Sequence, residues 1–223
     1  MKKLHGVRLA HHKNTENSAC VPLPLPKLVR IPMSMHIGAP CTPVVKPRET
    51  VQVGQKIGDT DAFMAVPIHS GVSGTVKAIS TYRMSNGRTC LMVEIETDGA
   101  QTVCPEVCPP VVTDKASFLQ AVRESGLVGM GGASFPAHVK LNPKQTVDTL
   151  VINAAECEPY ITSDYRQMVE APEEVLDGVC QVMHWLGIPK AVIGIEVNKP
   201  QAIRILTEKA KSHPEIQVVS LPT

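Results

Sequence analysis

The pattern of hydrophobic and polar positions changes character once along the chain. Between residues 33 and 99, short runs rich in Val, Ile and Thr alternate with glycine-marked turns, as in VQVGQKIGD, GVSGTVKAIS and RTCLMVEIET. Apolar runs of this length, bounded by turn residues, predict β-strands. The last of these runs ends in the tight-turn pair Asp98 and Gly99. We therefore predict a small all-β domain, a sandwich or barrel, over residues 33–99.

From residue 113 onward, helical and strand patterns alternate. The order is helix 115–125, strand 148–155, helix 172–186, strand 191–197, helix 199–212 and strand 216–221. Thr113 or Asp114 can cap the first helix, and Gly126 can end it in the left-handed conformation. Gly187 can end the second helix in the same way. Strands that alternate with helices are typical of a parallel sheet, so we predict an α/β domain over residues 113–223.

Two further segments lie outside these domains. Residues 1–32 include the proline-rich string VPLPLPKLVRIP, and prolines without amide donors favour an extended chain. We interpret 1–32 as an extended arm that packs on a surface, with a peptide ligand for another protein as the alternative. Residues 100–112 contain CPEVCPP and predict a linker between the domains.

Composition narrows the class of protein. Hydrophobic residues make up 43% of the 223 residues and charged residues 19%, as in an ordinary globular protein. Aromatic residues reach 3% and the formal net charge is +1. Nucleic-acid modules stack bases on aromatic side chains and neutralise phosphates with basic ones, so we expect no nucleic-acid partner. Crossing a bilayer takes roughly 20 apolar residues in a row, which the sequence lacks, so we expect no membrane insertion and a cytoplasmic location.

The cysteines give little indication of chemistry. There are seven, an odd number, scattered along the chain without a C-x-x-C pair. Cytoplasmic cysteines of this kind stay reduced, and without ligand spacing we expect no metal site. Cys157 has no histidine in its segment to activate it, so we interpret it as a small packed residue and assign no catalytic residue.

A glycine loop, GLVGMGGASFPAHVKL at residues 126–141, is the strongest functional signal. A backbone this bare can take positive φ values and bring its amides close to a flat ring or a phosphate. Ser134 can cap a short helix that starts at Phe135 and Pro136. The N-terminus of that helix, together with Lys140, would attract an anion. The glycines do not follow G-x-G-x-x-G, so a nucleotide site and a mobile turn both remain open from the residues alone.

An acidic segment, NAAECEPYITSDYR at residues 153–166, follows the predicted strand 148–155. Ligands of open parallel sheets bind beyond the C-terminal ends of the strands. Asn153, Glu156 and Glu158 leave the strand at that edge, where they can hydrogen-bond hydroxyl or amide groups of a ligand. The alternative is that the two glutamates cap the next helix or stay solvated.

Several strings, in collinear order, resemble the C subunit of the Rnf electron-transport complex. They are HIGAPCTPVVKPRETVQVGQKIGD, PIHSGVSGTVKAI, GLVGMGGASFPAHVKL, VINAAECEPYITSDYR and GIEVNKPQAI. The glycine loop is also similar to that of the flavoprotein subunit of respiratory complex I, which carries FMN and accepts hydride from NADH. The resemblance implies an α+β two-domain fold: an N-terminal all-β barrel-sandwich hybrid and a C-terminal α/β Rossmann-like parallel sheet, part of a flavin domain.

The resemblance also implies a cofactor and its contacts. FMN would be bound by Gly129, Gly131, Gly132, Lys140, Asn153, Glu156 and Glu158. Phe135 matches an aromatic residue on the side of the nicotinamide nucleotide. The hairpin that presents a modified lysine in biotinyl and lipoyl carriers reads DAFMAVPIHS at 61–70 and holds no lysine. We therefore expect the β domain to be structural or a docking surface.

Two departures from the family affect the expected function. The chain stops at Thr223 without a C-x-x-C-x-x-C run, so 4Fe-4S clusters are expected only in a missing C-terminal part. A fragment of this kind is expected to bind flavin weakly or not at all, and to be inactive alone. The N-terminus reads HGVRLAHHKN where many family members have a Gly-Gly-x-His-Pro stretch. This favours a divergent member, such as the soluble protein associated with proline reductase.

The leading hypothesis is an electron-transfer subunit that oxidises NADH through FMN and passes electrons to iron–sulfur clusters. Its partners would be NADH and other subunits of the complex, with the chain cytoplasmic or peripheral on the inner face of the cell membrane. Two alternatives remain. One is a soluble protein that delivers electrons to a proline or cobalamin reductase, and the other is a non-catalytic docking fragment.

Overall fold

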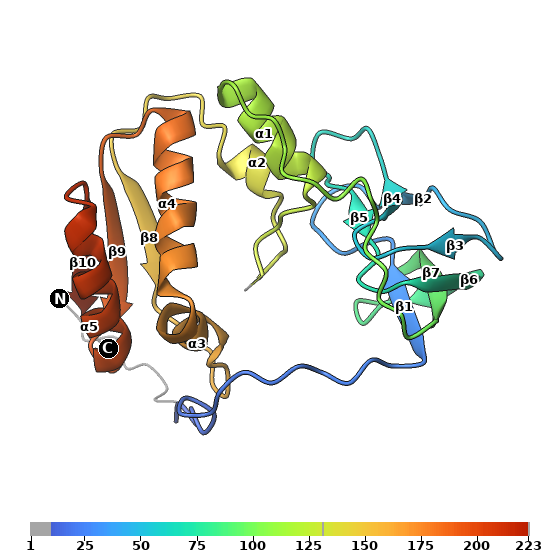
Figure 1. Cartoon of the computed structure of the whole chain (residues 1–223), viewed down its shortest axis with the longest axis horizontal. Helices are drawn as coiled ribbons and strands as arrows, with labels where there is room; N and C mark the ends of the chain where they lie inside the picture. The colour runs from blue at the N-terminus through green and yellow to red at the C-terminus, as the bar shows by residue number, and fades with distance from the viewer. Residues whose placement is uncertain (1–9, 131, 223) are drawn as a thin grey trace. The chain divides into compact units, whose positions relative to one another are not determined.

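The computed structural model describes residues 10–130 and 132–222, which form two compact units (Figure 1). We call residues Leu23–Lys144 the β unit. Residues 10–22 and 145–222 together form the α/β unit, which is therefore built from two separate stretches of chain. Within the described ranges, no helix combines the length and apolar character needed to cross a membrane.

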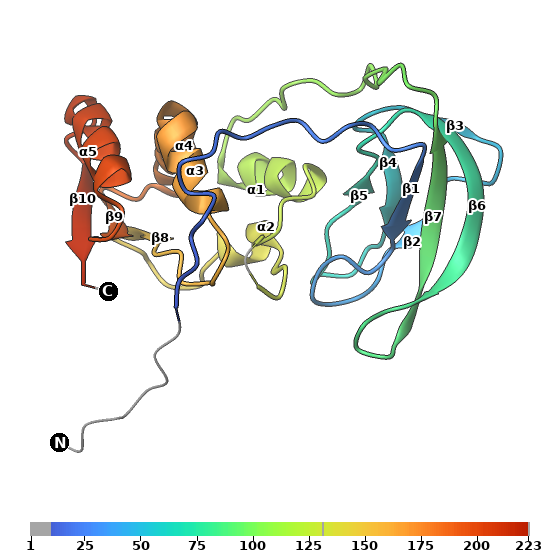
Figure 2. The same ribbon diagram turned by 90° about the horizontal axis from the view of Figure 1, so that it is seen from below.

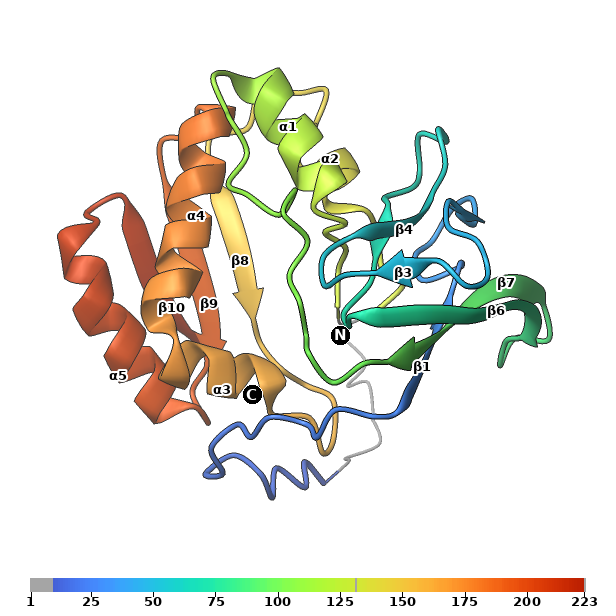
Figure 3. The ribbon, with the colours of Figure 1, turned by 45° about the vertical axis from the view of Figure 1, so that its right-hand side comes forward.

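The β unit contains two small sheets. The first has the order β1-β7-β6-β3 and the second the order β2-β4-β5. Neighbouring strands in both are antiparallel, and the long β6–β7 hairpin carries most of the first sheet (Figure 3). The strands are β1 (Leu28–Pro32), β2 (Thr42–Pro43), β3 (Thr50–Val51), β4 (Lys56–Asp59), β5 (Ile68–His69), β6 (Gly74–Arg83) and β7 (Thr89–Thr97).

Apolar and polar residues alternate along these strands, and this alternation explains the core of the β unit. Val51, Ile57, Val93 and Ile95 are fully buried, while their polar neighbours in sequence face outward. Met33 joins the same cluster from the segment after β1. The expected all-β organisation of this part of the chain is confirmed, as strands of both sheets fall within residues 33–99.

The described part of the predicted arm, residues 10–32, is divided between the two compact units. Leu28–Pro32 forms strand β1 at the edge of the first sheet, paired with Met92–Glu96 of β7. An edge position lets Pro32 end the strand without costing the sheet an amide donor. Residues 10–22 belong to the α/β unit.

The predicted linker over residues 100–112 is partly fixed. Val103 forms a bridge with Val53, and the Cys104 amide donates to the Val53 carbonyl oxygen over 2.9 Å. The Cys104 side chain is buried.

Two helices of the expected C-terminal domain pack in the β unit. They are α1 (Lys115–Glu124) and α2 (Ala137–Lys140), the second of which lies within the glycine loop. Asp114 and Ser117 form a capping box at the start of α1, and Gly126 follows its end with φ +72°, as predicted. The division into compact units therefore falls at Lys144 rather than at residue 113, and the predicted domain boundaries stay a prediction.

The α/β unit has a three-stranded parallel sheet in the order β10-β9-β8. Its helices α3, α4 and α5 lie on one face of this sheet (Figure 2). Buried Ile193 and Ile195 of β9 and Leu206 of α5 belong to the core between these layers. The elements are β8 (Leu150–Ala154), α3 (Ser163–Glu170), α4 (Pro172–Leu186), β9 (Ala191–Glu196), α5 (Pro200–Lys209), the 3-10 helix η1 (Ala210–Ser212) and β10 (Ile216–Leu221).

The predicted alternation of strands and helices in this unit is confirmed. Helix α4 has the predicted bounds, and Gly187 ends it with φ +66° in the left-handed region. The parallel direction of all three strands agrees with the expected α/β sheet. The sequence pattern does not predict helix α3, because it is short and only Tyr165 and Met168 in it are buried.

Candidate functional site

The glycine loop, residues 126–141, is closed at its base by backbone pairing. Val128 forms an antiparallel bridge with Pro136, and the Gly129 amide donates to the Phe135 carbonyl oxygen over 3.0 Å. The Ala137 amide donates to the Leu127 carbonyl oxygen over 2.9 Å. These bonds pair Leu127, Val128 and Gly129 with Phe135, Pro136 and Ala137 at the base of the loop. Gly131 lies outside the described residues.

The loop has room for a ligand where side chains are missing. A Cβ atom added at Gly132 would meet nothing within 4 Å. One added at Gly129 would lie 4.0 Å from the Lys140 ammonium nitrogen and 3.8 Å from the Phe135 amide nitrogen. Lys140 therefore places its positive charge beside the bare backbone, as an anionic ligand requires.

Ser134 does not cap the short helix, which corrects our prediction. Helix α2 begins at Ala137, and Pro136, its N-cap residue, makes no capping hydrogen bond through its side chain. Ser134 itself has φ +50°, a left-handed conformation that is uncommon for a residue with a side chain. Its carbonyl oxygen accepts from the Ile37 amide over 3.3 Å, so the loop is fastened to the segment after β1.

An open pocket of about 600 Å³ lies beside the loop within the β unit. One side of the pocket is formed by Gly132, Ala133 and Ser134, and Arg88 of the β6–β7 turn contributes a positively charged side chain. Its volume is in the range of ordinary cofactor sites. The remaining lining comes from residues 34–40 and 84–90.

An ion-pair network fixes helix α1 just ahead of the glycine loop. Arg123 contacts Asp59 at 2.9 Å and Glu124 at 2.6 Å, and Lys56 contacts the same two carboxylates at 2.8 and 2.7 Å. Burial alone would raise the pKa of Asp59, but hydrogen bonds from Lys56, the Thr60 amide and Arg123 hold it below its usual value. The pKa of Glu124 is lowered by Lys56 and Arg123 in the same way, against burial.

His138 of helix α2 is a titratable group within the glycine loop, and its pKa is shifted. Burial lowers the pKa of His138, which favours the neutral ring. Its Nδ1 atom is buried without a hydrogen-bond partner among the described residues. A neutral ring with an unused nitrogen is suited to one further hydrogen bond.

The acidic segment, residues 153–166, lies in the α/β unit, so the predicted cofactor residues come from both units. Asn153 is exposed in strand β8, and its side-chain oxygen accepts from the Ala155 amide over 3.1 Å. Glu158 is exposed as well. Both side chains remain accessible to a ligand.

Glu156 is buried, with 1% of its surface exposed. One carboxylate oxygen accepts from the Asp164 amide in the first turn of α3 over 2.8 Å. The other lies 3.5 Å from the Lys13 ammonium nitrogen. The carboxylate therefore caps a helix, which is the alternative interpretation for this residue, and its role in binding a cofactor stays a prediction.

Lys13 supports the acidic segment, a role that sequence reasoning missed. Besides the Glu156 carboxylate, its ammonium donates to the carbonyl oxygens of Glu156, Glu158 and Ile161, over 2.9, 2.9 and 2.6 Å. It holds the turn between β8 and α3 in one shape. No local pattern points to this role, because its partners lie more than 140 positions away.

Two family models match the chain. The RnfC barrel sandwich hybrid domain matches residues 2–100, and the Nuo51 FMN-binding domain matches residues 122–223. The second match includes the glycine loop and the acidic segment. The expected resemblance of both parts is thereby confirmed.

Curated proteins of known name match almost the whole chain. The C subunit of the Na(+)-translocating ferredoxin:NAD(+) oxidoreductase complex of Acetobacterium woodii is 42% identical over 93% of this chain and 49% of its own length. The C subunit of the proton-translocating ferredoxin:NAD(+) oxidoreductase complex of Clostridium ljungdahlii is 41% identical over 95% of this chain and 47% of its own length. The chain thus spans about half the length of these relatives.

Among solved structures, an NAD+-reducing [NiFe]-hydrogenase in the air-oxidized state matches 49% of this chain and 20% of its own chain. The identity is 24% and the TM-score 0.40. A likeness this partial adds nothing to the comparison of sequences.

Proposed function

We propose that this chain forms the FMN-binding part of an NADH-oxidising electron-transfer protein, because it belongs to the RnfC family. The members of this family are the C subunits of Rnf complexes. The observation that carries the proposal is the glycine loop. Its backbone lacks a Cβ atom at Gly129, beside the Lys140 ammonium, and at Gly132, where the space is open, and both lie inside the span that matches an FMN-binding domain.

These residues fit an FMN phosphate and ring. The open space at Gly132 admits a flat ring close to the backbone, and the Lys140 charge neutralises a phosphate. Arg88 in the neighbouring pocket supplies a second cation for an anionic cofactor or for the dinucleotide substrate. The loop and Lys140 would hold FMN, whose chemistry would be acceptance of hydride from NADH and transfer of single electrons.

The remaining predicted residues have separate tasks in this proposal. Asn153 and Glu158, both exposed, hydrogen-bond polar groups of the cofactor. Buried Glu156 shapes the turn that presents them, through Lys13 and the start of α3. Phe135, half-buried, lies on the side of the nicotinamide nucleotide. We further propose that the parallel sheet β10-β9-β8 is the start of a Rossmann-like nucleotide-binding fold.

The names of the relatives support a proposal for where the electrons go. Their names describe ion-translocating oxidoreductase complexes, so we propose other subunits of such a complex as partners and 4Fe-4S clusters outside this chain as the next carriers. Association with the complex would be peripheral to the membrane. An alternative is that the protein delivers electrons to a soluble reductase, which the divergent N-terminal sequence favours.

Titration of the untagged chain with FMN tests the proposal. We expect saturable quenching of FMN fluorescence, with riboflavin binding more weakly because it lacks the phosphate that Lys140 neutralises. Equal affinity for FMN and riboflavin would refute the assigned role of Lys140. A chain that leaves excess FMN fully fluorescent would instead support a non-catalytic docking module.

A further inference from the structure

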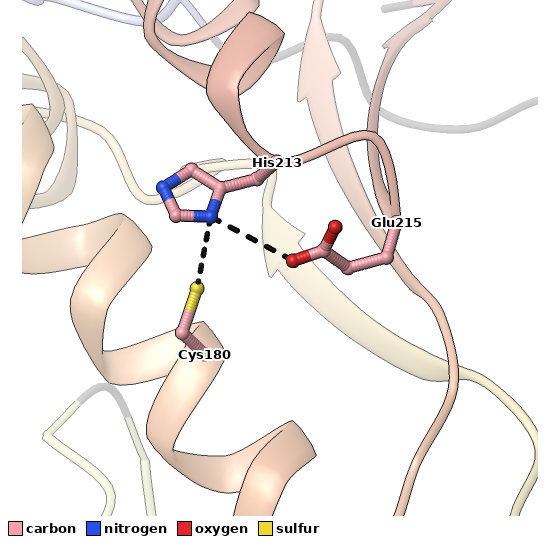
Figure 4. A group of neighbouring side chains, drawn as sticks. All are labelled: Cys180, His213 and Glu215. Carbon is pink, nitrogen blue, oxygen red and sulfur yellow. Dashed lines mark hydrogen bonds and ion pairs between the residues drawn. The ribbon is translucent and has the colours of Figure 1, made fainter.

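Three side chains with metal-binding atoms meet on the α/β unit, away from the glycine loop and the acidic segment. Cys180 comes from helix α4, and His213 and Glu215 come from the connection between η1 and β10 (Figure 4). Figure 4 shows the thiol and the carboxylate directed at the same edge of the imidazole ring. Nδ1 of His213 lies 3.5 Å from the Cys180 sulfur and 3.6 Å from a Glu215 oxygen.

The spacing of these atoms matches what a small divalent cation needs. Tetrahedral zinc, with bonds of about 2.3 Å to sulfur and about 2.0 Å to nitrogen or oxygen, holds its ligand atoms roughly 3.3–3.5 Å apart. Two of the three pairs in the cluster already stand near that separation. All three atoms lie within 4.8 Å of one another, so a modest rotation of the Glu215 side chain closes the third pair.

Hydrogen bonding accounts for the contact of Cys180 with His213 but less well for the contact of His213 with Glu215. The Nδ1–oxygen distance of 3.6 Å exceeds the usual 2.7–3.2 Å of an N–H···O bond. If the Cys180 thiol donates to Nδ1, that nitrogen has no proton left for the Glu215 carboxylate. A cation placed between the three atoms contacts them all.

The pocket beside the cluster supplies access and a candidate fourth ligand. Cys180 and Glu215 line an open pocket that also includes His184. His184 is four positions after Cys180 on α4, so both side chains lie on the same face of the helix. The sequence pattern is therefore C-x3-H on a helix followed by H-x-E on a loop. This pattern escapes a search for C-x-x-C pairs, which is why the sequence predicts no metal site.

We propose that Cys180, His213 and Glu215 form a binding site for a thiophilic divalent cation, of which Zn²⁺ is the type. Thiolate, imidazole and carboxylate are the ligands zinc takes in proteins, and water or His184 completes the tetrahedron. Binding replaces the thiol proton: the Cys180 S–H bond breaks, a sulfur–metal bond forms, and one proton goes to solvent. The bound cation links the segment just before β10 to helix α4.

The test uses the untagged, reduced chain with Co²⁺ as a spectroscopic probe and Zn²⁺ as its competitor. We expect one equivalent of Co²⁺ to produce the near-ultraviolet band of a cobalt–thiolate bond, and Zn²⁺ to abolish it. Zn²⁺ alone should raise the melting temperature of the chain, because it binds the folded state. Absence of a thiolate band at saturating Co²⁺ would overturn the proposal.

Variants assign the site to these residues. Cys180→Ser should remove the thiolate band. Glu215→Gln changes a half-exposed position that tolerates the substitution, and it should weaken Co²⁺ binding at least tenfold. That factor is on the order of what even residues of the outer shell contribute to metal affinity. The control is Cys157→Ser, which changes an exposed cysteine of the same unit and should leave the band intact. A band that persists in Cys180→Ser, or unchanged affinity in Glu215→Gln, would contradict the assignment.

Discussion

The ammonium nitrogen of Lys13 lies 3.5 Å from the carboxylate of Glu156, across 143 positions of sequence. Both side chains are largely buried, at 12% and 1% exposure. The pair joins the N-terminal stretch of the α/β unit to the turn after β8, where two of the predicted cofactor residues lie. Contacts of this kind decide both the stability of the unit and the shape of its proposed ligand-binding edge.

Replacing Lys13 should destabilise the α/β unit. Lys13→Ala leaves the buried Glu156 carboxylate without its cation, and breaking a buried pair from one side costs about 3 kcal/mol or more. Trp185, the one tryptophan of the sequence, lies in helix α4 and reports on this unit. Urea unfolding followed by tryptophan fluorescence should therefore show a lower midpoint. Lys190→Ala, at an exposed lysine of the same unit, is the control and should change little. Equal midpoints for the two variants would show that the pair is not stabilising.

Acid should weaken the β unit through the network around Arg123. The pKa values of Asp59 and Glu124 are lower in the folded state than in the unfolded chain. Their contribution is complete above the unfolded pKa values of about 4 and is lost as the pH falls through the folded ones. Both carboxylates are partly exposed, so we expect about 1 kcal/mol or less in total.

Arg123→Gln tests this dependence by calorimetry. The melting temperature of the variant should lie below that of the wild type near neutral pH, and the gap should narrow as the pH falls through the lowered pKa values of the two carboxylates. A gap that stays constant as the pH falls through that range would mean that the network contributes nothing through charge.

Gly126 should tolerate no side chain. Its φ of +72° disfavours other residues, and a Cβ atom would lie 2.8 Å from the Pro67 carbonyl oxygen. We expect Gly126→Ala to lower the stability of the β unit by about 1–3 kcal/mol, measured by thermal unfolding. Gly71→Ala is the matched control, because a Cβ there meets nothing within 4 Å. The prediction fails if both variants melt together.

FMN affinity should depend on the loop residues. Lys140→Ala removes the charge beside Gly129 and should weaken FMN binding about tenfold, as expected for one charge-assisted hydrogen bond. Gly129→Val places a side chain on the bare backbone beside Lys140 and should weaken binding further, and we expect the same result of Gly131→Val. Lys144→Ala, an exposed lysine just beyond the loop, is the control for net charge. Equal FMN affinity in Lys140→Ala and Lys144→Ala would remove Lys140 from the site.

The regular elements are predictable because their signals are local. Helix α4 combines a long apolar face with Pro172 in its first turn and Gly187 at its end, and strand β9 is a short run of apolar residues. Each signal lies within the element itself. The cap at Asp114 is equally local, and it predicts the start of α1.

The rest depends on contacts between distant residues. Nothing around Lys13 indicates that its ammonium binds three carbonyl oxygens of the segment after β8. Ser134 has the sequence context of a helix cap, but the bridge between Val128 and Pro136 and the bond to Ile37 set its backbone in a left-handed conformation. Cys180 and His213 meet only because β9 and α5 return the chain to α4.

The α/β unit is interrupted in sequence by the entire β unit, and this has a consequence for synthesis on the ribosome. Lys13 emerges first, yet its partner Glu156 is made 143 residues later. At about 5–20 residues per second, the wait is on the order of ten seconds. We expect the inserted β unit to fold during that time, while the early segment remains without its partners. A nascent chain released before residue 161 would then contain a folded β unit and an incomplete α/β unit.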